Sequence, residues 1–248
     1  MASRSTNLNT IAPKATSGYD WAEQHRSTTA GKTTVHFGDV ASAAERFIEQ
    51  SPMLVGCVAW IRSRRLVSAL AARPVALVVN KEFALRVDGS PERSALAPLR
   101  GGAPARALTA PRPKEPNLDA VRCAGHAMKG RFGALMHHKF LVRLDKEGKP
   151  TAVWTGSFNL TAGAEGNIEN GMEIHDPKVA QAFLEEFSRV WALSEPLVFK
   201  AGAPAPGSTS KAAPIVAKKR APARKRTTTK RKPPAKLSRT KAAPKRRA

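Results

Sequence analysis

Residues 136–170 read MHHKFLVRLDKEGKPTAVWTGSFNLTAGAEGNIEN. Two apolar-rich runs in this stretch, residues 139–144 and 151–155, are separated by Asp-Lys-Glu-Gly-Lys-Pro, whose polar residues, glycine and proline are typical of a turn. The pattern predicts a β-hairpin. The polar residues just before the first run and directly after the second therefore lie where hairpin strands begin or end.

The sequence before the hairpin alternates between strand-like and helix-like segments. The expected strands are residues 33–37, 53–61, 75–79 and 121–124, and the expected helices begin after Asp39, a good N-cap residue, and at residue 62. After the hairpin, Asp176-Pro177 predicts the start of a further helix with a core-facing apolar stripe at Val179, Phe183, Phe187, Val190 and Trp191. The alternation predicts an α/β domain with a mixed, mainly parallel sheet flanked by helices.

The chain of 248 residues is long enough for one such domain with appendages. Residues 1–30 lack clear periodicity, so we expect them to form a flexible N-terminal arm. We expect the catalytic domain to span residues 31–198 and a disordered tail to span residues 199–248. Residues 80–117 are dense in Pro, Gly and Arg and form either a surface loop without a specific role or a lid that touches substrate.

Only two cysteines are present, Cys57 and Cys123, both in apolar runs. Ordinary core packing explains them, with a redox or reactive role as the alternative, and their spacing does not suit a zinc site. The N-terminus lacks the apolar core of a signal peptide, and no run approaches the roughly 18 apolar residues of a membrane span. We expect a cytoplasmic protein, associated with the nucleoid if it is bacterial.

The side chains around the hairpin can bind and attack a phosphodiester without a metal or other cofactor. His137 offers a nitrogen nucleophile, and Lys139, two positions later, projects to the same side of an extended strand while His138 points away. Gly156, Ser157 and Asn159 follow the second run, where the glycine admits a ligand and the polar side chains can donate to phosphate oxygens. Glu169 is a candidate to hold the tautomer of the histidine. His25, His36 and His175 are expected at the surface or at strand ends, and His126, shortly before the motif, has no expected role, with an approach to the site as the alternative.

Each of these short patterns is common alone, but their ordered combination resembles the signature of the phospholipase D superfamily. The matching segments are MHHKFLV, WTGSFNLT and GNIENGMEI. The resemblance implies that His137 attacks phosphorus to give a phosphohistidine, that Lys139 and Asn159 bind the phosphoryl oxygens, that Ser157 lines the pocket and that Glu169 orients the histidine. It also implies a second histidine that protonates the leaving oxygen.

The chain departs from that signature in two ways. The family aspartate is expected at position 144, which holds leucine, and the nearest acid is Asp145; we expect a one-residue bulge or a longer hairpin that leaves Asp145 as a turn residue. Only one copy of the motif is present, so the resemblance implies a homodimer that shares one active site at a two-fold axis.

The tail suggests which phosphodiester is bound. Residues 211–248 contain sixteen Lys or Arg and no acid, which leaves +7 of the net charge of +23 for the rest of the chain. Such a tail resembles those of linker histones and can neutralise several phosphates without sequence preference. The residues expected to contact nucleic acid are Lys218, Lys219, Arg220, Arg224, Lys225, Arg226, Lys230, Arg231 and Lys232.

Taken with the site, the tail predicts a nuclease that acts on nucleic acid, DNA in preference to RNA. A solubility appendage and an anchor to an anionic membrane remain alternative roles for the tail. The alternative functions are a lipid phosphodiesterase with the same site, or a nucleic-acid-binding protein whose site is inert.

Overall fold

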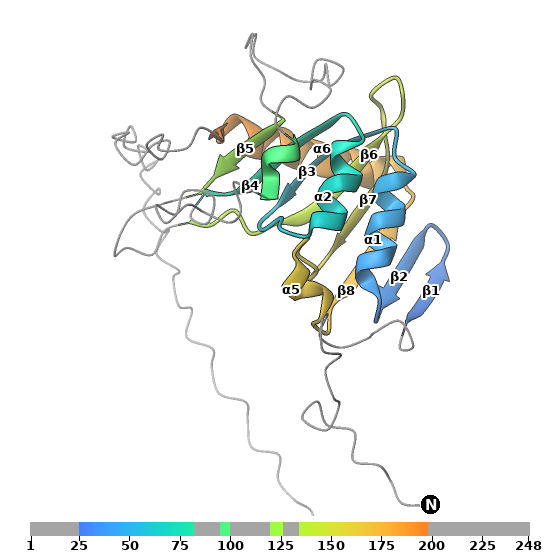
Figure 1. Cartoon of the computed structure of the whole chain (residues 1–248). Helices are drawn as coiled ribbons and strands as arrows, with labels where there is room; N and C mark the ends of the chain where they lie inside the picture. The colour runs from blue at the N-terminus through green and yellow to red at the C-terminus, as the bar shows by residue number, and fades with distance from the viewer. Residues whose placement is uncertain (1–24, 82–94, 100–119, 126–133, 198–248) are drawn as a thin grey trace, which may run out of the picture. The chain divides into compact units, whose positions relative to one another are not determined.

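The computed structural model describes residues 25–81, 95–99, 120–125 and 134–197 (Figure 1). The chain divides into two units, Met1–Lys211 and Ala212–Ala248, and every described residue belongs to the first. The predicted arm before residue 25, His126, most of residues 80–117 and the whole basic tail lie outside the described residues.

Nine described strands form one sheet in the order β1-β2-β8-β7-β6-β3-β4-β5-β9. The strands are β1 (Arg26–Ala30), β2 (Thr33–Phe37), β3 (Met53–Val58), β4 (Val75–Asn80), β5 (Val121–Ala124), β6 (Lys139–Leu144), β7 (Pro150–Gly156), β8 (Asn170–Ile174) and β9 (Glu195–Pro196). The helices of the described residues are α1 (Val40–Glu49), α2 (Arg64–Ala71), the 3₁₀ turn η3 (Ala97–Leu99), α5 (Ala162–Glu165) and α6 (Pro177–Ala192).

The predicted α/β class and mixed sheet are confirmed, but the prediction of a mainly parallel sheet is wrong. Among the described strands, only β3, β4 and β5 pair in parallel, and the other six pairings are antiparallel. The physical reason lies in the connections. Helix α2 crosses over between β3 and β4, whereas short turns join β1 to β2 and β6 to β7 and force those pairs to be antiparallel.

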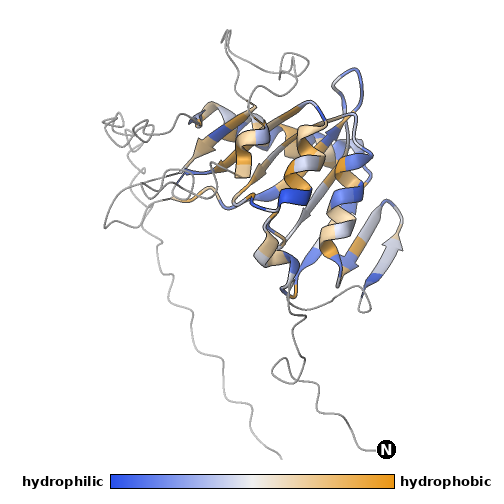
Figure 2. Ribbon diagram, viewed as in Figure 1, coloured by the Kyte–Doolittle hydropathy of each residue, from blue (hydrophilic) through white to orange (hydrophobic). Residues whose placement is uncertain are grey.

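Helices cover both faces of the sheet (Figure 1). Alternate residues of β6 point to opposite faces: Leu141 packs in a core with residues of α1 and α2, and Phe140 packs in a second core with residues of α6. Figure 2 shows hydrophobic and hydrophilic colours side by side on α1 and α2, as expected of helices with one buried side. The sheet is therefore buried on both faces where β6 and β3 run through its middle.

Capping residues fix where the helices begin. The carboxylate of Asp39 accepts a hydrogen bond from the Ser42 amide at 3.1 Å, and Asp176 accepts from the amides of Lys178 (2.8 Å) and Val179 (3.3 Å). These contacts satisfy amides that have no partner inside the helix. Both capping residues were predicted from the sequence, and both are confirmed.

Three boundaries differ from the prediction. Residues 26–30 form strand β1 rather than the end of a flexible arm, because their backbone pairs with β2 along its whole length. Strand β3 stops at Val58 instead of residue 61, and α2 begins at Arg64 instead of residue 62. The residues between β3 and α2 instead make an extended turn that contacts the candidate site described below.

The hairpin between β6 and β7 contains the predicted irregularity. Its register shifts between Arg143 and Leu144, so that Leu144 pairs with Pro150 and one residue of β7 is left over. Asp145 accepts hydrogen bonds from the amides of Glu147 at 3.0 Å and Lys149 at 2.8 Å. The prediction that Asp145 is a turn residue is confirmed, and the position of the family aspartate is occupied by the buried side chain of Leu144.

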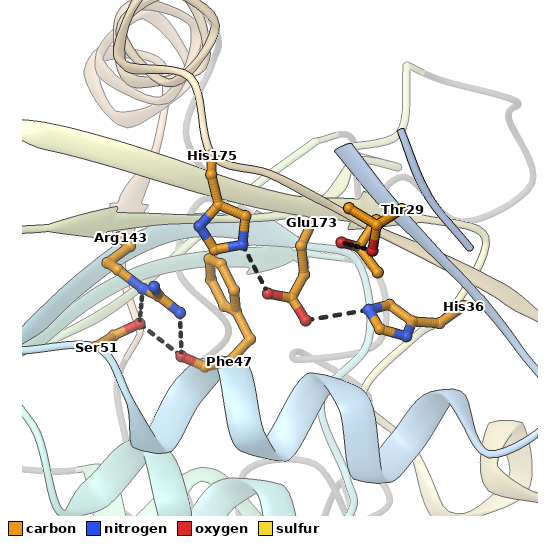
Figure 3. A network of polar contacts seen from close by, with 8 residues as sticks. Thr29, His36, Phe47, Ser51, Arg143, Glu173 and His175 are labelled. Atoms are coloured by element: carbon orange, nitrogen blue, oxygen red, sulfur yellow. Dashed lines mark hydrogen bonds and ion pairs between the residues drawn. The ribbon is translucent and has the colours of Figure 1, made fainter. Parts of the chain in front are cut away.

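A polar cluster lies between the sheet and α1 (Figure 3). Glu173 of β8 contacts two histidines, with Oε1 at 3.1 Å from Nε2 of His36 and Oε2 at 3.1 Å from Nε2 of His175. His36 is only 6% exposed and stacks on the Trp154 ring at 5.8 Å. His36 lies next to the end of β2, as expected, but it is buried rather than at the surface, because its side chain packs against Trp154.

Arg143 completes this cluster from β6. Its guanidinium lies 4.4 Å from the centroid of the Phe47 ring and donates to the Ser51 hydroxyl at 3.1 Å. It also donates to the backbone carbonyl of Phe47 at 3.4 Å. The charge is therefore held against the end of α1 rather than in solvent, and burial lowers the pKa of Arg143 while the charge of Glu173 opposes that shift.

Candidate active site

His137 and Lys139 lie together where β6 begins. The Lys139 ammonium donates to the His137 backbone carbonyl at 2.9 Å, and its Nζ is 3.1 Å from Nε2 of the same imidazole. An ammonium has no lone pair to accept a hydrogen bond, so the contact with Nε2 requires that nitrogen to be unprotonated. The lone pair of His137 and the positive charge of Lys139 therefore lie side by side at the exposed start of β6.

The surroundings favour the neutral form of that imidazole. Burial lowers the pKa of His137 below its ordinary value of 6.5, and the charges of Lys139 and His138 lower it further. Burial also lowers the pKa of Lys139, and the charge of Glu169 acts in the opposite direction. A histidine that stays neutral near pH 7 is suited to act as a nucleophile.

Trp60 contacts both residues and was not singled out from the sequence. Its ring meets the His137 ring edge-on, with centroids 5.2 Å apart and planes at 74°. Lys139 Nζ lies 5.5 Å from the centroid of the Trp60 indole. The antiparallel register brings them together, because Val58 pairs with Lys139 and the chain continues past β3 alongside the residues that precede β6. Only knowledge of that register reveals the contact.

Gly156 and Ser157 end β7 and join it to the segment that leads into β8. The Ser157 amide donates to the Asn170 carbonyl at 3.1 Å, and the Ser157 hydroxyl accepts from the Asn170 amide at 3.0 Å. A Cβ atom at position 156 would collide with the Asn170 carbonyl oxygen. Glycine is therefore required here for the approach of two backbone segments, in addition to any approach of a ligand.

Asn159 has a polar atom with no protein partner. Its Oδ1 is buried and accepts no hydrogen bond from any residue that the structure describes. Its neighbours Phe158 and Leu160 are both only 1% exposed, and they anchor the loop in the core. Buried polar groups nearly always have partners, and this oxygen can accept a hydrogen bond only from a donor group.

Glu169 contacts Ser157, whose hydroxyl donates to its carboxylate. The expected contact between Glu169 and His137 is absent among the described residues. The two halves of the motif are nevertheless close enough for Glu169 to act on the Lys139 charge. Within one chain the Glu169 carboxylate therefore binds the loop that contains Ser157. That Glu169 orients His137 rests only on the resemblance to the phospholipase D superfamily.

His138 faces away from this group, as predicted. Its Nε2 is 2.9 Å from Glu186 Oε1 on α6, and its ring meets the Phe140 ring edge-on at 5.5 Å. The side chains of His137 and His138 therefore lie on opposite faces of the sheet.

The structure thus brings His137, Lys139, Ser157, Asn159 and Glu169 to one edge of the sheet, with Gly156 between them and Trp60 beside them. No group of three or more His, Cys, Asp or Glu side chains in the described ranges is arranged to hold a metal ion. In the same ranges, no helix has the length and apolar character that would cross a membrane. The nine tail residues predicted to bind nucleic acid lie beyond the described residues.

A family model described as "Cardiolipin synthase, PLD-like domain" matches residues 73–191, a range that contains all of the motif residues. The domain belongs to the phospholipase D superfamily. Residues 73–191 therefore form a domain of phosphodiesterase type.

Two proteins are similar to this chain in sequence. An uncharacterized protein of Acanthamoeba polyphaga mimivirus is 23% identical over 198 residues, which is 67% of this chain and 68% of that protein. The mitochondrial cardiolipin hydrolase of Mus musculus is 40% identical over 62 residues, which is 25% of this chain and 26% of that protein.

Solved structures similar to this phospholipase D-like domain include two bacterial proteins. Nuc of Salmonella typhimurium, a phospholipase D family member, is 19% identical with a TM-score of 0.45 over 66% of this chain and 95% of that chain. NucT of Helicobacter pylori is 15% identical with a TM-score of 0.45 over 66% of this chain and 97% of that chain.

Proposed function

We propose that this protein is a metal-independent nuclease that hydrolyses nucleic acid, DNA in preference to RNA, through a phosphohistidine on His137. The observation that carries the proposal is the 3.1 Å separation between Nε2 of His137 and Nζ of Lys139. The ammonium stabilises the charge that develops on the phosphoryl oxygens, and the imidazole supplies the electron pair.

The reaction then has two steps. His137 Nε2 forms a bond to phosphorus as the bond to the leaving oxygen breaks, and a second histidine gives that oxygen a proton. Water next attacks the phosphohistidine, the same second histidine takes up the proton of the water, and the nitrogen–phosphorus bond breaks. Asn159 and Ser157 line the pocket for the phosphoryl group, with Glu169 beside them.

The second histidine comes from a partner subunit in this proposal. The chain has one His-x-Lys followed by one Gly-Ser-x-Asn, and the reaction needs two histidines. A homodimer with the two His137 residues facing each other across a two-fold axis supplies both. Light scattering tests this separately: a monomeric mass in a fully active sample would rule out the shared site.

The choice of nucleic acid rests on the charge of the tail. Sixteen Lys or Arg in residues 211–248, with no acid, favour an extended polyanion. Truncation after Gly207 should weaken binding and its salt dependence while leaving hydrolysis of a small phosphodiester.

A lipid phosphodiesterase is the second candidate. It is favoured by the similarity to the mouse mitochondrial cardiolipin hydrolase and by two exposed apolar side chains in or next to the motif segments. Ile168, next to Glu169, is 71% exposed, and Leu135, two residues before His137, is 48% exposed. Side chains of this kind suit the surface of a bilayer.

One assay separates the candidates. The purified protein, with a chelator present, is incubated with plasmid DNA, RNA, and vesicles of cardiolipin or phosphatidylcholine. The proposal expects cleavage of nucleic acid, and turnover of lipid alone would refute it. His137→Ala should abolish turnover while salt-sensitive DNA binding persists. If the unmodified protein binds DNA but cleaves none of these substrates, its site is inert.

A further inference from the structure

Two arginines flank Ser63 where the turn after β3 leads into α2. Arg62 and Arg64 are both exposed, and neither has an acidic partner among the described residues. The neighbouring Arg65 differs, because its Nε lies 3.2 Å from Glu45 Oε2. The guanidinium groups of Arg62 and Arg64 are therefore available to an external anion.

Backbone contacts fix the turn to the loop that holds Asn159. The amides of Arg62 and Ser63 both donate to the carbonyl of Leu160, at 2.7 and 2.9 Å. The Ser63 hydroxyl donates to Glu165 Oε1 at 2.5 Å on the far side of the same loop. The backbone of Arg62 therefore lies beside Leu160, the residue that follows Asn159 in the chain. This is the edge of the sheet where the phosphate is expected.

Trp60 anchors the other end of the turn, because its ring lies against His137 and its indole faces the Lys139 ammonium. The turn is thus held by both halves of the motif. Arg62 follows Trp60 by two residues in this turn, and Arg64 is the first residue of α2.

Folding alone does not account for these charges. Helix α2 begins at Arg64 and has no acidic residue in its first turn. The N-terminus of a helix already carries partial positive charge, so basic residues there oppose the dipole, and acidic residues are preferred. The nearby carboxylates of Glu165 and Glu169 accept hydrogen bonds from Ser63 and Ser157 and so hold the loops together. An unpaired cationic edge at this place suits the binding of phosphate groups.

We propose that Arg62 and Arg64 bind backbone phosphates that flank the scissile phosphodiester, and so select a nucleic-acid strand over an isolated phosphodiester. This inference rests on the proposed nuclease function and adds the residues that recognise the strand outside the reacting group. Arginine suits this role because its planar guanidinium can donate two hydrogen bonds to one phosphate.

The test compares the full-length protein with a variant in which Arg62→Ala and Arg64→Ala are combined. Two substrates are used: a single-stranded oligodeoxynucleotide of about ten residues, and bis(4-nitrophenyl) phosphate, which has no flanking phosphates. We expect kcat/KM on the oligonucleotide to fall about tenfold, with kcat/KM on the small substrate changed less than twofold. The slope of log kcat/KM against log salt should become shallower by about 1.4, for two contacts to a single strand.

The matched control removes two positive charges at the other end of β6. Lys146 and Lys149 are exposed in the turn after Leu144, away from His137, and the variant combining Lys146→Ala with Lys149→Ala should behave as the parent on both substrates. Circular dichroism and thermal unfolding check that both double variants remain folded.

A second oligonucleotide has uncharged methylphosphonates on both sides of one cleavable phosphodiester. The parent should lose activity on it, and the Arg62/Arg64 variant should lose little more, because the charges that the arginines recognise are already absent. Equal losses on the oligonucleotide and on bis(4-nitrophenyl) phosphate would overturn the inference, as would an unchanged kcat/KM on the oligonucleotide. Failure of the parent to cleave any nucleic acid would instead refute the proposed function.

Discussion

Lys139 Nζ lies 3.1 Å from His137 Nε2, and the same ammonium lies 5.5 Å from the centroid of the Trp60 ring. The lysine thus contacts the nucleophile that we propose and the aromatic ring that packs against it. Loss of the charge and loss of the ring should have different effects on the histidine.

Lys139→Met should raise the pKa of His137, because the charge of Lys139 is one of the causes that lower it. The variant should also lose about 100-fold or more in kcat, since the charge on the transition state is no longer stabilised. The pKa is measured by NMR titration of the imidazole, and the rate with bis(4-nitrophenyl) phosphate. Lys32→Met, which removes an exposed lysine paired with Asp176, serves as the control and should leave both quantities unchanged.

Trp60→Ala should lower kcat more than it raises KM, by about tenfold, because His137 loses the ring that fixes its orientation. The pKa of His137 should rise in this variant, since burial is the largest cause of its depression. Trp60→Phe keeps an aromatic ring at this place and should restore most of kcat. If Trp60→Ala changes stability but neither kcat nor the pKa, the tryptophan has no positioning role.

Gly156→Ala should destabilise the fold by about 1–3 kcal/mol, because the added methyl group collides with the Asn170 carbonyl. The free energy of unfolding is measured in urea. Gly163 offers a matched control within α5, since a Cβ atom there meets nothing within 4 Å. Gly163→Ala should be neutral or stabilise by about 0.4–1 kcal/mol, so equal destabilisation by the two substitutions would contradict the structure.

His36→Gln should flatten the dependence of stability on pH below 6.5. Burial lowers the pKa of His36 in the folded protein, although Glu173 raises it in part. As the pH falls through 6.5, the unfolded chain binds a proton that the folded chain does not, so the contribution of neutral His36 is present above pH 6.5 and lost below it.

The maximum slope from this one proton is about 1.4 kcal/mol per pH unit. Glutamine can still donate to Glu173 but does not titrate, so the free energy of unfolding should fall less between pH 6.5 and 5. The comparison variant is His175→Gln, which replaces the exposed histidine that contacts the other oxygen of Glu173. A variant that follows the parent curve would show that His36 does not carry the acid sensitivity.

Local sequence determined much of what could be predicted. The β6–β7 hairpin, the turn role of Asp145 and the caps Asp39 and Asp176 all depend on residues close together in the chain. Periodicity likewise placed Phe187 and Trp191 in the core. These features depend on neighbours that the sequence itself specifies.

The errors concern contacts between distant segments. A strand shows its apolar character without showing which strand lies beside it, so the sequence did not reveal that β2 pairs with β8 and buries His36. For the same reason Trp60 was overlooked. Register across the sheet decides both. That Glu169 orients His137 stays a prediction, and within one chain its carboxylate contacts Ser157.

The hairpin that joins the two halves of the motif has a consequence for how this domain can change over time. Phe140 pairs with Thr155, only fifteen residues later, so the edge that holds the reactive groups forms through contacts of short sequence separation. Insertions or losses in the segment between β4 and β5 leave that pairing intact. Descendants of one ancestral hairpin can therefore acquire new substrates through their surrounding segments while inheriting the same chemistry.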